Sequence, residues 1–193
     1  GSGGTVQLTS ANDDIQLLAA GTNRGDINNS ATGGNGGVIT VNAGDDISID
    51  GRVINTSTGT GGTVSMTGAD GSVTISNNGS TAFAIDNSTS NGTGGNINLT
   101  ANGAGENVTV SGTILNTSTG NAGNITLTST NNSIAVTDGG ADTANIINTS
   151  STGNAGTITL NSFNATTVDG FIDNSTTGAA GTITMVSQNS TVQ

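Results

Sequence analysis

Acidic side chains are the main chemical resource of this chain, which has 193 residues, thirteen Asp and Glu, and two Arg. The sequence contains no His, Cys, Lys or Tyr, so it offers neither a nucleophile paired with a strong base nor a Schiff-base amine. Paired carboxylates can hydrolyse glycosides, but sugar-binding grooves usually have aromatic platforms, and the chain has only three Phe. We therefore predict that the protein is not an enzyme.

Two pairs of neighbouring acids could bind a metal ion: Asp13 with Asp14, and Asp45 with Asp46. Both pairs precede a short segment of alternating apolar residues, so a repeating fold would place one pair above the other. Calcium takes six to eight oxygen ligands, and carboxylates supply them. The alternative is an acidic corner that faces water, because the nonapeptide calcium repeat is absent. We expect no resident cofactor, and calcium at these four residues is the metal hypothesis.

The tripeptide Arg24, Gly25 and Asp26 spells RGD. Integrin-binding adhesins present this tripeptide on exposed turns, so these three residues are a candidate adhesive motif. The alternative is chance, because the two later segments that correspond to this one lack the tripeptide.

The charge balance excludes several classes of partner. The formal net charge is −11, whereas nucleic acids and anionic lipid surfaces select clustered Lys and Arg. No apolar run approaches the roughly 18 residues of a membrane-spanning helix, so we expect no membrane insertion. The expected partners are a surface, a glycan or neighbouring copies of the same chain.

These residues are positioned by an internal repeat, which is the strongest signal in the sequence. A phrase such as "GGTVSMT" (61–67) alternates with a phrase such as "VINTSTG" (53–59). The second glycine of the first phrase falls at 4, 37, 62, 95, 123, 156 and 181, so successive spacings are 33, 25, 33, 28, 33 and 25 residues. The repeat therefore alternates a long turn with a short turn.

Each turn contains three short segments whose apolar residues alternate with polar ones, as in half-buried β-strands. In the second turn they are Ile39/Val41, Ile47/Ile49 and the segment that begins at Val53. No single turn can bury its own apolar face, so the turns must stack, with each strand parallel to its copies about 4.8 Å away. We predict an all-β parallel β-helix, or β-solenoid, with three strands per turn and about six to seven turns over residues 1–193.

One Asn recurs two residues after the first apolar residue of the third strand, so it should also point inward. Stacked amides can hydrogen-bond along the solenoid axis as an Asn ladder. Five of the six lie in N-x-[ST] sequons, but an inward Asn is a poor sugar acceptor. The predicted ladder consists of Asn29, Asn55, Asn87, Asn116, Asn148 and Asn174.

Two surfaces of the predicted solenoid are candidate binding faces. The long turns insert about six residues at one corner, in segments 19–26, 77–84 and 138–145; such loops are common binding sites, although a simple bulge is the alternative. The outward side of the first strand is rich in Thr, interrupted by residues such as Gln7, Asn98 and Val38. Its Thr residues are Thr5, Thr9, Thr40, Thr63, Thr67, Thr126, Thr128, Thr157, Thr159 and Thr184.

The phrases "AGNITLT" (122–128) and "ILNTSTG" (114–120) resemble the haemagglutinin-type repeats of filamentous-haemagglutinin-like adhesins, the large exoproteins of two-partner secretion. The resemblance covers nearly the whole chain. It implies a right-handed β-helical shaft and an extracellular or cell-surface setting. We expect a single solenoid segment that has been excised from a longer repeat protein.

The sequence therefore predicts a structural or adhesive shaft module of a secreted or cell-surface bacterial adhesin or extracellular matrix protein. Such a module would act by rigid display and by association with surfaces or with itself. The alternative function is ice binding, because regular Thr columns on a solenoid resemble the ice-binding face of some antifreeze proteins.

Overall fold

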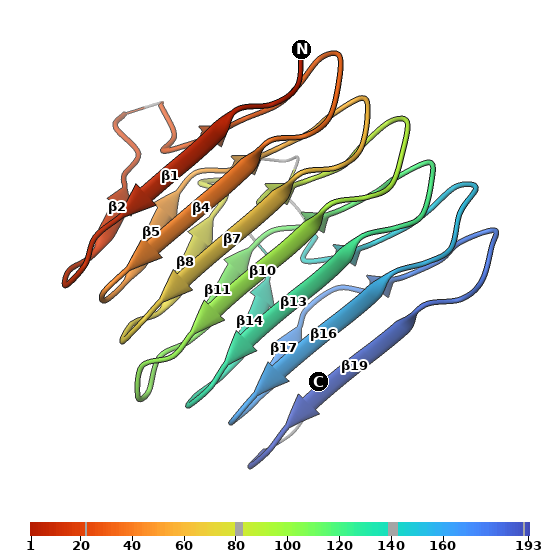
Figure 1. Cartoon of the computed structure of the whole chain (residues 1–193). Helices are drawn as coiled ribbons and strands as arrows, with labels where there is room; N and C mark the ends of the chain where they lie inside the picture. Colours follow the sequence, from red (N-terminus) through yellow and green to blue (C-terminus); the bar gives the residue numbers. More distant parts are fainter. Residues whose placement is uncertain (22, 80–82, 139–142, 191) are drawn as a thin grey trace.

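The computed structural model describes residues 1–21, 23–79, 83–138, 143–190 and 192–193. In this part of the chain the only regular secondary structure is β-strand, and the strands form three parallel sheets. Figure 1 shows the strands of the largest sheet side by side, with the N-terminus and the C-terminus at opposite ends of the stack.

Sheet one has seven strands: β1 (Thr5–Thr9), β4 (Val38–Ala43), β7 (Thr63–Gly68), β10 (Asn96–Ala101), β13 (Asn124–Ser129), β16 (Thr157–Ser162) and β19 (Thr182–Ser187). Sheet two has six strands: β2 (Ile15–Leu17), β5 (Ile47–Asp50), β8 (Val73–Ser76), β11 (Val108–Ser111), β14 (Ile134–Thr137) and β17 (Thr166–Val168). Sheet three has six: β3 (Ile27–Asn28), β6 (Val53–Ile54), β9 (Ile85–Asp86), β12 (Ile114–Leu115), β15 (Ile146–Ile147) and β18 (Ile172–Asp173).

The chain visits the three sheets in turn, so each coil of the solenoid contributes one strand to every sheet. The structure has about six coils of 29 residues on average, and β19 begins a seventh. The prediction of a three-stranded parallel β-solenoid is therefore confirmed. The pairing is in register: Ile97 of β10 lies beside Val64 of β7 on one side and Ile125 of β13 on the other.

The core is a set of apolar columns that run along the solenoid axis. The inward residues of the central coils, such as Ile39, Met66, Leu99 and Leu127, are fully buried. Because strand residues alternate between the two faces of a sheet, the neighbours of these residues point outward, and a shift of one residue would expose the whole column. Apolar alternation therefore sets the register of the stack.

The predicted Asn ladder lies at the corner that follows sheet three. Four hydrogen bonds from Nδ2 to Oδ1 join its members, from Asn55 to Asn87 (2.9 Å), Asn87 to Asn116 (3.3 Å), Asn116 to Asn148 (2.9 Å) and Asn148 to Asn174 (3.1 Å). Asn55, Asn87, Asn116 and Asn148 are fully buried, so four of the five sequon Asn within the ladder are inaccessible.

The ladder stops before its first predicted member. Asn29 is half-buried, and its Nδ2 donates to two backbone oxygens, Gly4 O (3.0 Å) and Val38 O (3.3 Å), with no bond to Asn55. As a result, Oδ1 of Asn55 is buried without a hydrogen-bond partner among the described residues. An amide nitrogen has only two hydrogens, so backbone acceptors can compete with the ladder.

The Asn ladder explains why the second glycine of the first phrase recurs in each coil. Each ladder Asn also donates to the carbonyl of such a glycine, as from Asn116 to Gly95 O (3.0 Å) and from Asn148 to Gly123 O (2.9 Å). A Cβ on Gly95 would collide with the carbonyl oxygen of Gly62 and with Nδ2 of Asn87. Any side chain at this position would therefore separate adjacent coils.

We predict that Asn116→Ala destabilises the fold strongly. The substitution removes one of the acceptors of the Asn87 amide, which keeps its bond to Gly62 O, and it removes the donor to Oδ1 of Asn148 and to the carbonyl of Gly95. Each buried group that loses its partner costs about 1–3 kcal/mol. The free energy of unfolding in urea should fall by roughly 3 kcal/mol. The control is Asn91→Ala, an exposed Asn whose side chain makes no hydrogen bond among the described residues, and it should change stability by about 0.5 kcal/mol or less. Equal losses for the two variants would contradict a structural ladder.

Candidate functional site

The outward side of sheet one is a grid of three columns, because the seven strands pair in register. The first column contains Thr5, Val38, Thr63, Asn96, Asn124, Thr157 and Thr182. The middle column contains Gln7, Thr40, Ser65, Asn98, Thr126, Thr159 and Thr184, and the third contains Thr9, Asn42, Thr67, Thr100, Thr128, Asn161 and Val186. All ten predicted Thr residues lie in this grid. Thr100 and Thr182 also belong to it, and the same alternation identifies them.

The polar groups of the middle and third columns are available for contacts outside the chain. Within the described residues, no hydrogen bond involves a side chain of these two columns, whereas the first column is partly self-bonded. Oδ1 of Asn124 accepts hydrogen bonds from the backbone N–H and the hydroxyl of Thr157 (3.0 and 2.6 Å), and Oδ1 of Asn96 accepts the N–H of Asn124 (3.2 Å). The middle and third columns thus form the free part of the sheet-one face.

The sheet-one face is uncharged, although the chain is strongly acidic. None of its seven strands contains a charged residue. Six of the thirteen acids lie along one edge of this face, at the corner between sheets one and two, in the first four coils. These six, which we name the acidic corner, are Asp13, Asp14, Asp45, Asp46, Asp70 and Glu106.

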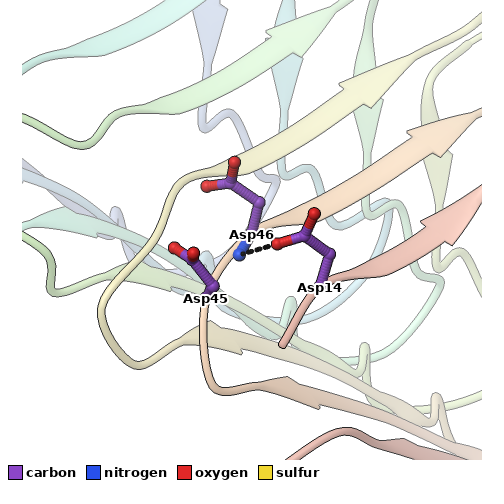
Figure 2. A group of neighbouring side chains, drawn as sticks. All are labelled: Asp14, Asp45 and Asp46. Carbon is purple, nitrogen blue, oxygen red and sulfur yellow. Dashed lines mark hydrogen bonds between the residues drawn. The ribbon is translucent and has the colours of Figure 1, made fainter. Parts of the chain in front are cut away.

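Three of the four predicted calcium ligands come together at the acidic corner. Figure 2 shows Asp14, Asp45 and Asp46 as neighbouring side chains. One carboxylate oxygen of each lies within 4.8 Å of the others. Asp13 is not in this group; its Oδ1 accepts the N–H of Asp14 (3.1 Å). The pKa of the Asp45 carboxyl is raised by partial loss of hydration and then by the charges of Asp46, Asp14, Glu106 and Asp70. Calcium binding here stays a prediction.

Two of these acids also have a structural role that the sequence did not reveal. Oδ1 of Asp14 accepts the backbone N–H of Asp46 (3.2 Å), and Oδ1 of Asp46 accepts the N–H of Ser72 (2.7 Å). The pattern continues up the stack, because Asn107 N–H donates to Ser72 Oγ (3.1 Å) and Ser133 N–H donates to Asn107 Oδ1 (3.2 Å). Each side chain thus caps the same backbone position in the following coil. The sequence signal that could have identified this role is the recurrence of Asp, Ser or Asn directly before the second strand of each coil.

The RGD tripeptide lies at the corner between sheets two and three, and its carboxylate is engaged. Asp26 Oδ2 accepts a hydrogen bond from Nη2 of Arg52 (2.7 Å), and the guanidinium carbon of Arg52 lies 5.6 Å from the ring centre of Phe83. Arg52 belongs to a short coil. It thus contacts the long-corner segments of both neighbouring coils, through Asp26 in one and Phe83 in the other. Integrin binding stays a prediction, and it would require Asp26 to leave Arg52.

Electrostatics reinforce this contact. Burial alone would raise the pKa of the Asp26 carboxyl, but hydrogen bonds from the side chain and backbone of Arg52, and the charges of Arg52 and Arg24, hold that pKa below its ordinary value. The ion pair therefore contributes stability at neutral pH, and that contribution is lost as the pH falls through the lowered pKa.

Asp86 is the most deeply buried acid in the described part of the chain, with 9% of its surface exposed. It lies on the outward side of sheet three, between Ile54 of one neighbouring strand and Leu115 of the other. Burial raises the pKa of its carboxyl, although the hydrogen bond from Ser88 N–H to Oδ1 (3.0 Å) acts in the opposite direction. Asn28 makes the same type of bond to Ser30 N–H (3.1 Å), so a neutral amide suffices in this geometry.

The long-corner segments are only partly visible as a binding site. Residues 22, 80–82 and 139–142 of segments 19–26, 77–84 and 138–145 lie outside the described residues. Among the described residues there is no pocket, and no helix is long and apolar enough to cross a membrane. The sheet-one face is therefore the candidate site whose geometry is defined.

No family model, no curated protein and no solved structure matches this chain. The geometry of the solenoid and its surfaces is thus the basis for any functional conclusion.

We predict that Asp46 and Asp45 respond differently to truncation. Asp46→Ala removes the acceptor of Ser72 N–H and should lower the free energy of unfolding by about 1 kcal/mol. Asp45→Ala removes an exposed carboxylate that is repelled by its neighbours, so stability should not fall.

Calorimetry of the same variants with calcium and with a chelator tests the metal hypothesis. A calcium-induced rise in melting temperature that disappears in Asp45→Ala would establish an ion site.

We predict that Asp86→Asn stabilises the protein at neutral pH. Because the folded-state pKa of Asp86 is raised, its ionisation opposes folding, and wild-type stability falls as the pH rises from about 3.9 through that pKa. The variant should therefore melt at a higher temperature at pH 7, and the difference should vanish near pH 3. Asp173→Asn, at the same position of a more exposed coil, is the control and should have a smaller effect. A lower melting temperature for Asp86→Asn at pH 7 would contradict the prediction.

Proposed function

We propose that this chain is a shaft module of a secreted or cell-surface adhesin or extracellular matrix protein, which acts by rigid display and by contact through the sheet-one face. The observation that carries the proposal is the continuity of the stack: all three sheets and the Asn ladder run through successive coils. A fold that repeats one coil along an axis is suited to span distance and to present a long surface.

The contacts between coils support rigidity. The first six coils are joined, each to the next, through three parallel strand pairs, and the corners add bonds such as Asn116 N–H to Ile147 O (2.8 Å) and Ser118 N–H to Thr149 O (2.9 Å). Bending the rod would stretch these bonds at many coils together. The described residues form no concave pocket, so a shape-based role fits better than the capture of a small molecule.

The extracellular bacterial setting rests on the resemblance of the repeats to those of filamentous-haemagglutinin-like exoproteins. In this chain the phrase "AGNITLT" (122–128) contains strand β13, and the phrase "ILNTSTG" (114–120) forms the corner with the ladder residue Asn116. The ladder supports this comparison, because an Asn at this position can hydrogen-bond to its equivalents wherever copies of the phrase are stacked.

The free part of the sheet-one face supports contact with a flat partner. Its thirteen polar side chains and Val186 repeat at about 4.8 Å along the axis and about 6.6 Å across the strands. A regular array of weak donors and acceptors gains affinity when many contacts form together. A glycan layer or a solid surface is such a partner.

The same array favours ice binding as the second candidate function. The hydroxyls of Thr126, Thr159 and Thr184 lie in one column on successive strands, with no hydrogen bond to another described residue. Gln7 and Asn98 interrupt the middle column, and Asn42, Asn161 and Val186 interrupt the third. The third column therefore has its own run of three hydroxyls, Thr67, Thr100 and Thr128, in the central coils.

We predict that beads sparsely coated with the chain attach to a cellulose, chitin or glass surface under flow. The double variant Thr126→Glu/Thr159→Glu should reduce attachment at least about tenfold, because two charges would have to be desolvated on contact. The control, Thr109→Glu/Thr167→Glu, places the same charges on the outward side of sheet two. Attachment to none of the three surfaces, or equal loss in both variants, would contradict adhesion through sheet one.

We further predict no thermal hysteresis at millimolar concentration. A clear gap between the melting and freezing points, abolished by Thr126→Glu/Thr159→Glu, would instead support ice binding.

A further inference from the structure

We propose that two copies of this chain pair face to face through sheet one, with their solenoid axes parallel. The pairing deepens the proposed shaft role and rests on it, because it names the partner of the sheet-one face as a second copy. The argument rests on charge, on the geometry of the face and on its area.

Charge determines which face two copies can share. Each copy carries a formal net charge of −11, so close approach is unfavourable wherever carboxylates meet. The outward side of sheet two ends in Asp50, and that of sheet three includes Asp86 and Asp173. The seven strands of sheet one have no charged residue, so of the three described sheets this one allows contact without opposing carboxylates.

Charge also determines the relative orientation. The acidic corner lies along one edge of sheet one, next to the third column. A two-fold axis parallel to the solenoid axis places the two acidic corners on opposite edges of the pair. They are then at least about 17 Å apart, which is the width of the face and about twice the Debye length at physiological salt. A two-fold axis along the strands would bring both acidic corners to the same edge.

In the parallel arrangement the middle column faces its own copy. Each coil lies opposite the same coil of the partner, so Thr40 faces Thr40 of the partner subunit and Thr126 faces Thr126 of the partner subunit. Hydroxyls both donate and accept, so a Thr can satisfy a Thr across an isologous interface. The free part of the face, which has no internal hydrogen bonds in the described structure, thereby finds partners. Its threonine methyl groups provide apolar contact.

The area of the face predicts the strength of the pairing. Seven strands at about 4.8 Å, each about 17 Å long, give roughly 550 Å² per copy and roughly 1,100 Å² in total. This is above most crystal contacts and just below the standard size of a specific interface. The pair should therefore form weakly and reversibly, and a longer stack of such coils would pair more tightly.

Sedimentation velocity over micromolar to millimolar concentration tests the pairing. We expect the sedimentation coefficient to rise toward that of a dimer, and to rise more at 150 mM than at 10 mM NaCl because salt screens the repulsion between copies. Thr126→Glu should weaken association at least about tenfold, because two carboxylates would face each other. Thr109→Glu on sheet two, at a position of similar exposure, should leave association unchanged. A monomer at every concentration, or equal loss in both variants, would overturn the proposal.

Single-cysteine variants test the orientation, because the chain has no Cys of its own. With a short bis-maleimide, Thr40→Cys should cross-link to itself if the axes are parallel. Cross-linking of Thr40→Cys only to Thr159→Cys would mean opposed axes and would overturn the parallel arrangement. If the protein is monomeric but still attaches to surfaces, the pairing is wrong and the adhesive shaft role stands. If it forms dimers but attaches to no surface, the adhesive role is wrong and the pairing stands.

Discussion

In-register stacking of coils is the constraint on which the rest of this structure depends. A coil of about 29 residues has too little apolar surface to fold alone, so the inward residues of the central coils are buried by the coils above and below them, whereas inward residues of the terminal coils, such as Val6 and Ile183, stay partly exposed. The backbone groups have the same dependence, since their hydrogen bonds run mainly between coils, with a few local exceptions such as Glu106 N–H to Gly103 O. Register is therefore a property of the whole stack, and the Asn ladder enforces it, because a buried amide has partners only when equivalent residues are aligned.

The corners show how polar residues serve this stack. After sheet three, Asn side chains bond to one another and to glycine carbonyls, which explains why the glycines can have no side chain. Before sheet two, Asp14 and Asp46 cap backbone N–H groups of the following coil. The capping acids gather near other carboxylates, so this corner is electrostatically unfavourable while its hydrogen bonds are favourable. Neutral residues, Asn107 and Ser133, take over the same position in later coils.

This division of polar residues leaves one surface distinct. Many corner side chains bond within the stack, while the side chains in the middle and third columns of sheet one are outward, uncharged and without hydrogen bonds to other described residues. The pairing of two copies and the contact role of the shaft both use this contrast between side chains that bond within the stack and a flat face whose polar groups are free for external contacts.

The sequence by itself determined the periodic part of the protein. Alternation of apolar residues, the recurrent Asn and the recurrent Gly specify strand faces, corners and the ladder, because each signal is repeated in every coil and depends on neighbours of the same type. Only the tertiary structure decided the features that depend on distances between unlike residues. Examples are the missing bond between Asn29 and Asn55, the contact of Asp26 with Arg52, and the burial of Asp86 between Ile54 and Leu115. Periodicity shows which residues stack, but the competition between backbone and side-chain partners is resolved only by their positions in space.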